Sequence, residues 1–299
     1  MSGNAVAPAE NFRAELASSS NIFRDRFGGL SDEQWRDLLI RSLDEPVIDG
    51  LEFPGFPAAE LQTQIHGHAA AASLHEAYSV YRYVKKATNL AALPQTGVNF
   101  LDFGAGWGRI SRLFLRDFEL SRMFGFEPNL AFCTVARALN PYMCFLNGDY
   151  RPDGTLPPDR FDIVVGWSVF SHLSPDTAAA WLEEMVRVVR KDGYCVFTTW
   201  GERFLDRLIA ERDQLARGKP IDWYSERCLQ AAGDIAQRRE RYRYGEFVWF
   251  TGHQSTTYGE AFLPPPALRR LLQTRRIKLE LVEFDQTTLA QDVFVLRRA

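Results

Sequence analysis

The chain has 299 residues, with 46% hydrophobic and 24% charged side chains. This is ordinary globular usage and excludes the low-hydrophobicity composition of disordered chains. At about 150 residues per domain, the length predicts two domains or one large domain with additions. The 35 basic and 38 acidic residues leave a net charge of −3, so no overall electrostatic attraction to nucleic acid or to an anionic membrane is expected.

The cysteine pattern and the absence of long apolar segments indicate the compartment. None of the four cysteines forms a C-x-x-C pair, which favours buried reduced thiols over disulfides or zinc. No segment approaches the ~20 apolar residues that span a bilayer. Residues 1–15 lack the basic and apolar blocks of a signal peptide. We therefore expect a cytoplasmic protein without membrane insertion.

Residues 1–95 are predicted to form a helical extension. It is broken at Pro46 and across the Pro-rich run 52–57. Between residues 69 and 88, apolar and aromatic side chains recur at helical spacing and predict one buried face. Those side chains are Leu74, Tyr78, Tyr81 and Val84.

Residues 96–200 show short apolar runs that alternate with helical stretches, which is the pattern of β-α-β units around a parallel sheet. Strands are expected near 98–103, 122–127, 142–147, 161–167 and 193–200, and helices near 107–117, 129–139 and 175–190. Ser174 and Pro175 are typical of a helix start, and the run 191–193 is expected to end that helix before the next strand.

Residues 201–262 are too long for an ordinary connection and are interpreted as an insertion. Residues 263–299 return to the core pattern. They are expected to hold a short helix after Pro264 and then two strands, near 276–285 and 291–298, that form a hairpin.

The strongest motif is the run LDFGAGWGRI, residues 101–110. An apolar strand ends at Asp102, and glycines at 104, 106 and 108 lead into a helix, which lets the backbone turn tightly against a ligand. The dinucleotide fingerprint G-x-G-x-x-G would need a third glycine at position 109, which is Arg109 here. A carboxylate before the first glycine would also repel a pyrophosphate, so the loop favours a cationic ligand.

Two later strands also end in acidic residues. Glu127 follows the second strand, where a carboxylate can accept hydrogen bonds from both hydroxyls of a ribose. Asp149 follows the third strand, where it could accept from an adenine amine or simply cap a turn.

These motifs, followed by FDIVVGWSVFSHL (161–173), resemble those of class I S-adenosylmethionine-dependent methyltransferases. The resemblance implies an α/β, Rossmann-like, doubly wound sheet of seven strands whose last strand is antiparallel, with S-adenosylmethionine as cofactor. It also implies a set of cofactor-binding residues, with Asp102 near the methionine amino group, Glu127 on the ribose, and Trp167 beside the sulfonium, to which an aromatic face is favourable. That set is Asp102, Gly104, Gly106, Glu127, Pro128, Asp149, Tyr150, Trp167 and Ser168.

The acceptor is expected to be a small molecule or a glycan, methylated at oxygen. A general base would then remove the hydroxyl proton. The two candidates are His172, which is a structural residue in many relatives, and His253 in the insertion. The resemblance also implies that residues 1–95 and 201–262 form the acceptor lid, and Tyr78, Tyr81 and Tyr258 are expected to contact the acceptor.

Several other interpretations are less well supported. His66, His68 and His75 lack metal-ligand spacing, and the fourth strand ends in Val165-Gly166-Trp167-Ser168, without the Asp of metal-dependent catechol-type enzymes, so no metal is expected. The same strand end lacks the motifs of DNA base methylation, and no nucleic-acid partner is expected. A non-catalytic module that binds S-adenosylmethionine and a nucleotide-dependent oxidoreductase are the alternatives, and the oligomeric state is not indicated.

Overall fold

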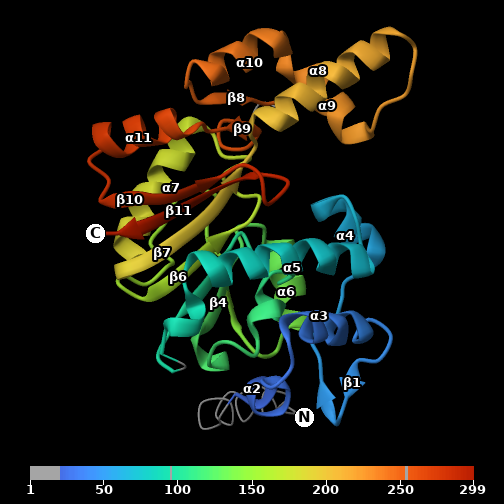
Figure 1. Ribbon diagram of the computed structural model, residues 1–299, viewed down its shortest axis with the longest axis vertical. Coiled ribbons are helices and arrows are strands. Elements are labelled where there is room, and N and C mark those ends of the chain that lie inside the picture. Colours follow the sequence, from blue (N-terminus) through green and yellow to red (C-terminus); the bar gives the residue numbers. More distant parts are fainter. Residues whose placement is uncertain (1–20, 95, 253–254) are drawn as a thin grey trace, which may run out of the picture. The chain divides into compact units, whose positions relative to one another are not determined.

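A computed structural model describes residues 21–94, 96–252 and 255–299. The chain divides into two compact units, Met1–Gly148 and Asp149–Ala299. The seven main strands form one sheet in the order β10-β11-β7-β6-β3-β4-β5 (Figure 1). This order and the flanking helices confirm the predicted Rossmann-like α/β class.

In the described residues, four α-helices precede the first main strand of the first unit. Its elements are α2 (Ile22–Phe27), α3 (Asp32–Arg41), β1 (Val47–Ile48), β2 (Leu51–Glu52), α4 (Ala59–His66), α5 (Ala70–Ala87), the 3-10 helices η1 (Leu90–Ala92), η2 (Ser111–Phe114) and η3 (Leu120–Arg122), β3 (Phe100–Phe103), β4 (Met123–Phe126), α6 (Leu130–Leu139) and β5 (Cys144–Leu146). Helix α5 buries the predicted apolar face, including Leu74, Tyr81 and Val84.

The second unit begins with a β-α-β unit and ends in the expected hairpin. Its elements are β6 (Phe161–Gly166), α7 (Pro175–Val188), β7 (Val189–Thr199), α8 (Glu202–Ala216), α9 (Trp223–Ala232), α10 (Ile235–Arg243), β8 (Val248–Phe250), β9 (Glu260–Phe262), α11 (Pro265–Thr274), β10 (Leu279–Asp285) and β11 (Asp292–Arg298). Strands β6 and β7 pair in parallel, whereas β11 is antiparallel to both β7 and β10. The prediction of an antiparallel last strand is therefore confirmed.

Two predictions of local structure are wrong. The expected helix over 107–117 is a series of turns with only the short 3-10 helix η2, because Gly108 takes a positive φ of 84° that an α-helix cannot include. Helix α7 ends at Val188, and β7 already begins at Val189, so the run 191–193 lies inside the strand. Asp192 there has a φ of 65°, which bends the strand without ending it.

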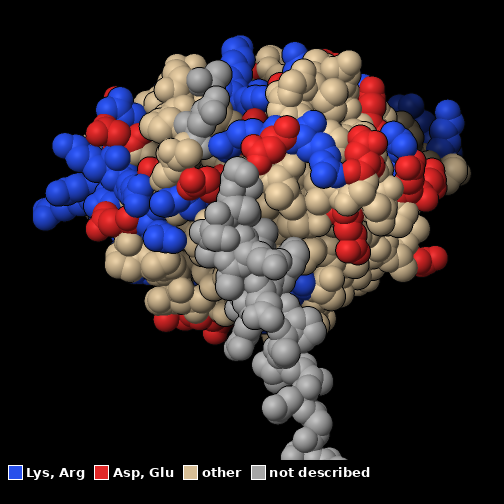
Figure 2. Space-filling view, turned by 90° about the horizontal axis from the view of Figure 1, so that it is seen from below, with Lys and Arg blue, Asp and Glu red and all other residues tan. Residues whose placement is uncertain are grey.

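The insertion forms a small hydrophobic core of its own within the second unit. Helices α8, α9 and α10 and the ribbon of β8 and β9 bury a shared set of side chains. The arginine-rich run of α10 lies on the surface, where its arginines form ion pairs such as Arg239 with Asp206 and Arg243 with Glu202. Figure 2 likewise shows acidic side chains interspersed among the basic ones on the face that it draws.

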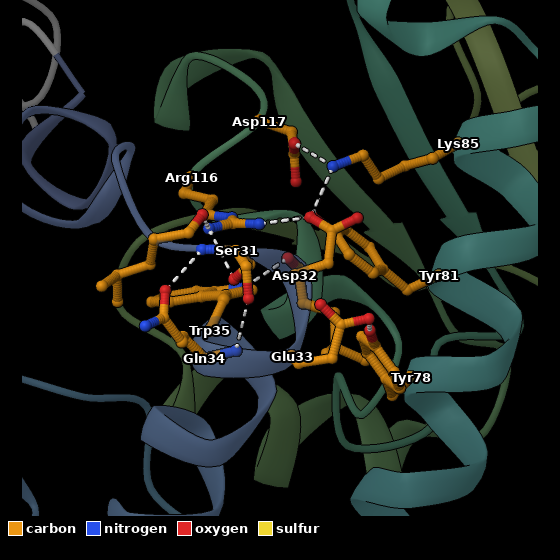
Figure 3. A network of polar contacts seen from close by, with 12 residues as sticks. Ser31, Asp32, Glu33, Gln34, Trp35, Tyr78, Tyr81, Lys85, Arg116 and Asp117 are labelled. Atoms are coloured by element: carbon orange, nitrogen blue, oxygen red, sulfur yellow. Dashed lines mark hydrogen bonds and ion pairs between the residues drawn. The ribbon is translucent and has the colours of Figure 1, made fainter.

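A network of charged side chains joins α3 to α5 and to the segment after η2 in the first unit (Figure 3). Asp32 accepts hydrogen bonds from Lys85 Nζ (2.8 Å) and Tyr81 Oη (3.2 Å) and is ion-paired with the buried Arg116. Lys85 also pairs with Asp117 at 3.5 Å. Burial raises the pKa of Asp32, but its bonds to Lys85 and the charge of Arg116 outweigh that effect and hold the pKa below its usual value. Asp32 is thus the common partner of two cations.

Asp32→Asn should destabilise the protein, because it leaves Arg116 buried beside a neutral amide. We expect a loss of about 3 kcal/mol in the free energy of unfolding, measured by urea denaturation at neutral pH. Asp37→Asn is the matched control, since Asp37 is exposed and pairs only with its neighbour Arg36. Equal stability of the two variants would contradict the role given to Asp32.

Candidate functional site

The loop after β3 is built by glycine. Gly104 and Gly106 take positive φ values of 74° and 56°, which favour glycine, and Gly104 N and Ala105 N donate to the carbonyl of Phe126 on β4. Gly108 also takes a positive φ, of 84°, and a Cβ there would lie 2.9 Å from the side chain of Asn140. All three glycines therefore shape the loop, and Gly108 also leaves room for the side chain that follows α6.

Asp102, at the end of β3, faces the interior of the first unit. Its Oδ2 accepts hydrogen bonds from the backbone N of Ser111, at 3.1 Å, and from the Ser111 hydroxyl. Burial raises the pKa of this carboxyl to about 6, although the bonds to Ser111 and the charge of Arg109 oppose the rise. Asp102 thus holds the segment after the glycine loop, and its predicted contact with the methionine amino group stays a prediction.

Glu127 follows β4 and is only 6% exposed. Its Oε2 accepts from Gly106 N at 2.8 Å, and its Oε1 accepts from Asn129 N at 2.9 Å. Burial raises its pKa, and these two backbone donors oppose the rise. Each carboxylate oxygen can accept a second hydrogen bond, so Glu127 retains the capacity to bind two ribose hydroxyls. Pro128, the next residue, contributes its carbonyl to Asn147 Nδ2 at 3.1 Å.

Two buried arginines beside the glycine loop were not singled out from the sequence. Arg109 is 2% exposed, donates from Nη1 to the carbonyl of Ser73 and pairs with Glu76, while its Nε has no hydrogen-bond partner in the described part of the chain. Arg112 lies over the rings of both Phe56 and Trp107, with Cζ 4.2 Å and 4.4 Å from their centroids. The G-x-G-R spacing is the signal that could have drawn attention to Arg109.

Arg112 ties the N-terminal extension to this loop. Its Nη2 donates to the carbonyl of Gly55 at 2.8 Å, and Gly55 N donates to the carbonyl of Leu139. Burial lowers the pKa of Arg112 to about 9, so the guanidinium is still charged at neutral pH. Carbonyl oxygens and aromatic faces solvate this charge.

In the second unit, Asp149 and Tyr150 are exposed near its start. Asp149 N donates to Asp153 Oδ2 at 3.0 Å, and Tyr150 N donates to Asp149 Oδ1, which is the geometry of a turn. The Tyr150 carbonyl accepts from Trp181 Nε1 at 2.9 Å. These contacts support the turn-forming alternative for Asp149, and its contact with adenine stays a prediction.

The end of β6 is strained and tightly bonded. Trp167 is buried, and Ser168 has a φ of 57°, which is uncommon for a residue with a side chain. Ser168 N donates to Thr198 Oγ1 at 2.8 Å, and Ser168 Oγ accepts from Gln291 Nε2 at 2.9 Å. Such strain is common at functional sites, and the cofactor contacts of these two residues stay predictions.

His172 lies in the loop after β6, which pairs with the chain segment leading into β9. Gly259 N donates to the His172 carbonyl at 2.7 Å, and Ser174 N donates to the Thr257 carbonyl at 2.9 Å. The His172 ring stacks on Tyr258, with centroids 4.8 Å apart. The structure therefore brings together a predicted base and a predicted acceptor-binding residue that are far apart in the sequence.

Glu260, the first residue of β9, was not predicted as a site residue. It is 5% exposed and accepts from Tyr224 Oη at 2.7 Å and Trp200 Nε1 at 3.0 Å. Arg227 Nη2 donates to its other oxygen at 3.2 Å. The sequence gives no signal for this cluster, because the segments around residues 200, 224 and 260 are joined only by the fold of the insertion.

A cavity of about 210 Å³ adjoins this cluster in the second unit. Its walls come from α9 and from residues 251–252 and 258–260. They combine apolar and polar groups, including Arg227, Cys228, Ala231, Thr251, Tyr258 and Glu260. Burial raises the pKa of the Cys228 thiol, so this thiol is not an activated nucleophile.

The remaining predicted residues lie elsewhere. Tyr78 and Tyr81 are buried in the first unit, where their hydroxyls donate to Glu33 and Asp32, so their contact with an acceptor stays a prediction (Figure 3). His253 lies outside the described residues. Among the residues that the structure describes, no three His, Cys, Asp or Glu side chains converge as a metal site would require. No helix in the described ranges could cross a membrane.

Comparisons with known proteins agree with this fold. Residues 100–193 match a family described as "Methyltransferase domain". A search of curated proteins found no match. A solved S-adenosylmethionine-dependent methyltransferase from Clostridium acetobutylicum is similar over 80% of this chain and 96% of its own, with 9% identity and a TM-score of 0.50.

Two further solved structures are similar at lower TM-scores. One is an S-adenosylmethionine-dependent methyltransferase from Mesorhizobium loti, with 15% identity, a TM-score of 0.47 and coverage of 74% of this chain and 98% of its own. The other is geranyl diphosphate methyltransferase in complex with its cofactor, with 11% identity, a TM-score of 0.45 and coverage of 76% and 88%.

The sheet order and the antiparallel last strand give the chain the fold of the Clostridium acetobutylicum methyltransferase, and residues 100–193 match the methyltransferase domain family. S-adenosylmethionine is the cofactor for which that solved neighbour is named. The first unit fits this ligand, since Glu127 offers unused acceptor positions and Arg109 Nε is a buried donor in need of an acceptor such as a carboxylate.

Glu127→Ala should weaken the binding of S-adenosylmethionine by about 1–3 kcal/mol, because two ribose hydroxyls would lose their charged acceptor. Isothermal titration calorimetry measures this change. Glu45→Ala is the control, since Glu45 forms only an exposed pair with Arg41. An unchanged affinity in Glu127→Ala would contradict the ribose assignment.

Proposed function

We propose that this protein transfers a methyl group from S-adenosylmethionine to a hydroxyl group of a small-molecule or glycan acceptor, without a metal ion, and that His172 is the general base. The observation that carries this proposal is the hydrogen bond that the His172 ring makes with the backbone. Its Nδ1 lies 2.9 Å from the carbonyl oxygen of Gly259. The ring is partly exposed, with 12% of its side-chain surface accessible.

The Gly259 carbonyl determines which nitrogen can act as the base. A carbonyl oxygen only accepts hydrogen bonds, so Nδ1 must carry the proton of the neutral ring. Nε2 then presents its lone pair, and no described residue donates to it. The backbone thus selects the tautomer that a base requires.

When bound, the cofactor supplies a methyl group on a sulfonium. His172 Nε2 would take the acceptor O–H proton as the acceptor oxygen receives the methyl group, so that the methylated product is neutral. The protein must hold the acceptor oxygen in line with the methyl group, which supplies much of the rate enhancement of a displacement.

The cavity bounded by Tyr258 and Glu260 is the proposed acceptor site. It adjoins the residue on which His172 stacks, and its mixed lining suits an acceptor that has both hydroxyl groups and an apolar face. Residues 201–262 would then serve as the acceptor lid. The self-contained core of this insertion supports such a role, since it gives the lid a fixed shape.

Replacement of His172 tests the base. His172→Ala should lower the turnover number by roughly 10²–10⁴, with cofactor affinity unchanged, because removal of a positioned base affects the chemical step. The assay follows S-adenosylhomocysteine release against a panel of phenols, sugars and oligosaccharides, with mass spectrometry of the product. His75→Ala, an exposed position on α5, is the control.

If no acceptor in a broad panel is methylated although the cofactor binds, the non-catalytic module becomes the better description. If His172→Ala turns over at the rate of the wild type, proximity alone carries the reaction.

Turnover should survive chelation. The fourth main strand ends in Val165-Gly166-Trp167-Ser168, which offers no carboxylate for a metal at the strand end. We expect equal rates with and without EDTA in the same assay. Loss of activity in EDTA, restored by Mg²⁺, would contradict the metal-free reaction.

A further inference from the structure

We propose that Glu260 is a positioning residue for His172, which it orients and whose positive charge it stabilises once the ring has accepted the acceptor proton. This inference rests on the proposed role of His172 as the base. Glu260 belongs to the insertion, residues 201–262, whereas His172 belongs to the loop after β6.

The first argument is the rigidity of the carboxylate. Three donors from two segments of the chain fix Glu260: the Trp200 indole after β7, and the Tyr224 hydroxyl and the Arg227 guanidinium on α9. A carboxylate held by three donors does not need to reorganise when a charge appears beside it. Preorganised charge of this kind stabilises a transition state more than a mobile side chain does.

The second argument is the position of the carboxylate relative to His172. Glu260 Oε2 lies 3.5 Å from His172 Nδ1, the nitrogen that faces away from the proposed proton transfer. In the neutral ring, the Nδ1 proton is directed to the Gly259 carbonyl at 2.9 Å. After protonation at Nε2, the ring carries a full charge, and the carboxylate at this distance becomes its counterion.

The third argument is the burial of the pair. The side chains of Glu260 and His172 are 7% and 12% exposed. Charges interact more strongly in such a site than at the surface, because little water screens them. The imidazolium would therefore be costly here without the carboxylate.

The other titratable groups around Glu260 and His172 determine the net charge near the His172 ring. Arg227, from α9, is the cation nearest to Glu260 and opposes its effect on His172. Tyr224 and Cys228, also from α9, have pKa values raised mainly by burial, so both are neutral at physiological pH. Tyr258 stacks on the ring from the segment before β9. Glu260 and Arg227 therefore act on His172 in opposite directions.

This opposition gives a test that needs no acceptor. Nuclear magnetic resonance follows the imidazole signal of His172 in the full-length protein as the pH changes, and its loss in His172→Ala assigns it. In Glu260→Gln, which preserves the shape of the side chain but removes its charge, we expect the titration midpoint of His172 to fall. In Arg227→Gln it should rise, because the remaining carboxylate is no longer shared with a cation.

A purely structural Glu260 would give a different result. In that case Glu260→Gln would lower thermal stability but leave the midpoint unchanged, and the proposal would be overturned. If Glu260→Gln fails to fold, Arg227→Gln decides alone, since Arg227 is half exposed and its removal leaves the Tyr224 and Trp200 bonds in place. An unchanged or lowered midpoint in Arg227→Gln overturns the proposal.

The titration and the turnover assay separate this inference from the proposed function. If the midpoint shifts but the His172→Ala variant is fully active, the interaction between Glu260 and His172 is confirmed, and His172 is not the general base. Once an acceptor is known, Glu260→Gln should lower the turnover number with little effect on KM, and the pH at which the rate is half maximal should shift with the titration midpoint.

Discussion

The short antiparallel pairing between residues 171–174 and 257–261 fixes the geometry on which the rest of the candidate acceptor site depends. Gly259 N and Ala261 N donate to the carbonyls of His172 and Ser171, and Ser174 N donates to the Thr257 carbonyl. These bonds connect the loop after a central strand to an insertion more than 80 residues later in the chain. Through them, Tyr258 and Glu260 reach His172 at a defined register, as neighbouring strands do.

In both units, buried charged groups fix the positions of neighbouring side chains. In the first unit, Asp32 and Arg116 connect the helical extension to the segment after η2, and Asp102 holds Ser111. In the second unit, Glu260 gathers donors from α9 and from the end of β7. A buried charge is costly unless it is paired, so each such group is accompanied by partners that leave it few alternative positions. The same property makes these clusters sensitive to single substitutions.

The sheet could be predicted from sequence because its strands are nearly continuous apolar runs, and because glycine and acidic residues stand at fixed distances around them. Glu127 is found in this way, from its position after a buried strand. The absence of a helix over 107–117 could not be predicted from the sequence. The apolar residues there have helical spacing, and only the backbone angle of Gly108 excludes the helix. Local patterns do not report such a constraint.

The acceptor side could be predicted only in part. His172 and Tyr258 were named separately, but their stacking depends on a long-range pairing that has no sequence signature. Glu260 was missed for the same reason. Tyr78 and Tyr81, on the other hand, belong to an amphipathic stripe whose ordinary explanation, packing against another helix, accounts for their contacts with α3.

The cation–aromatic stack around Arg112 has a consequence for how the polypeptide can be shortened. The Phe56 ring and the Gly55 carbonyl shield a guanidinium that belongs to the segment directly after the glycine loop. A chain that began beyond Pro57 would expose this cation and one face of Trp107 to solvent. The stretch at 53–57 thus packs directly on the segment after the glycine loop, and a shortened polypeptide must retain it even though it lies outside the residues that match the family.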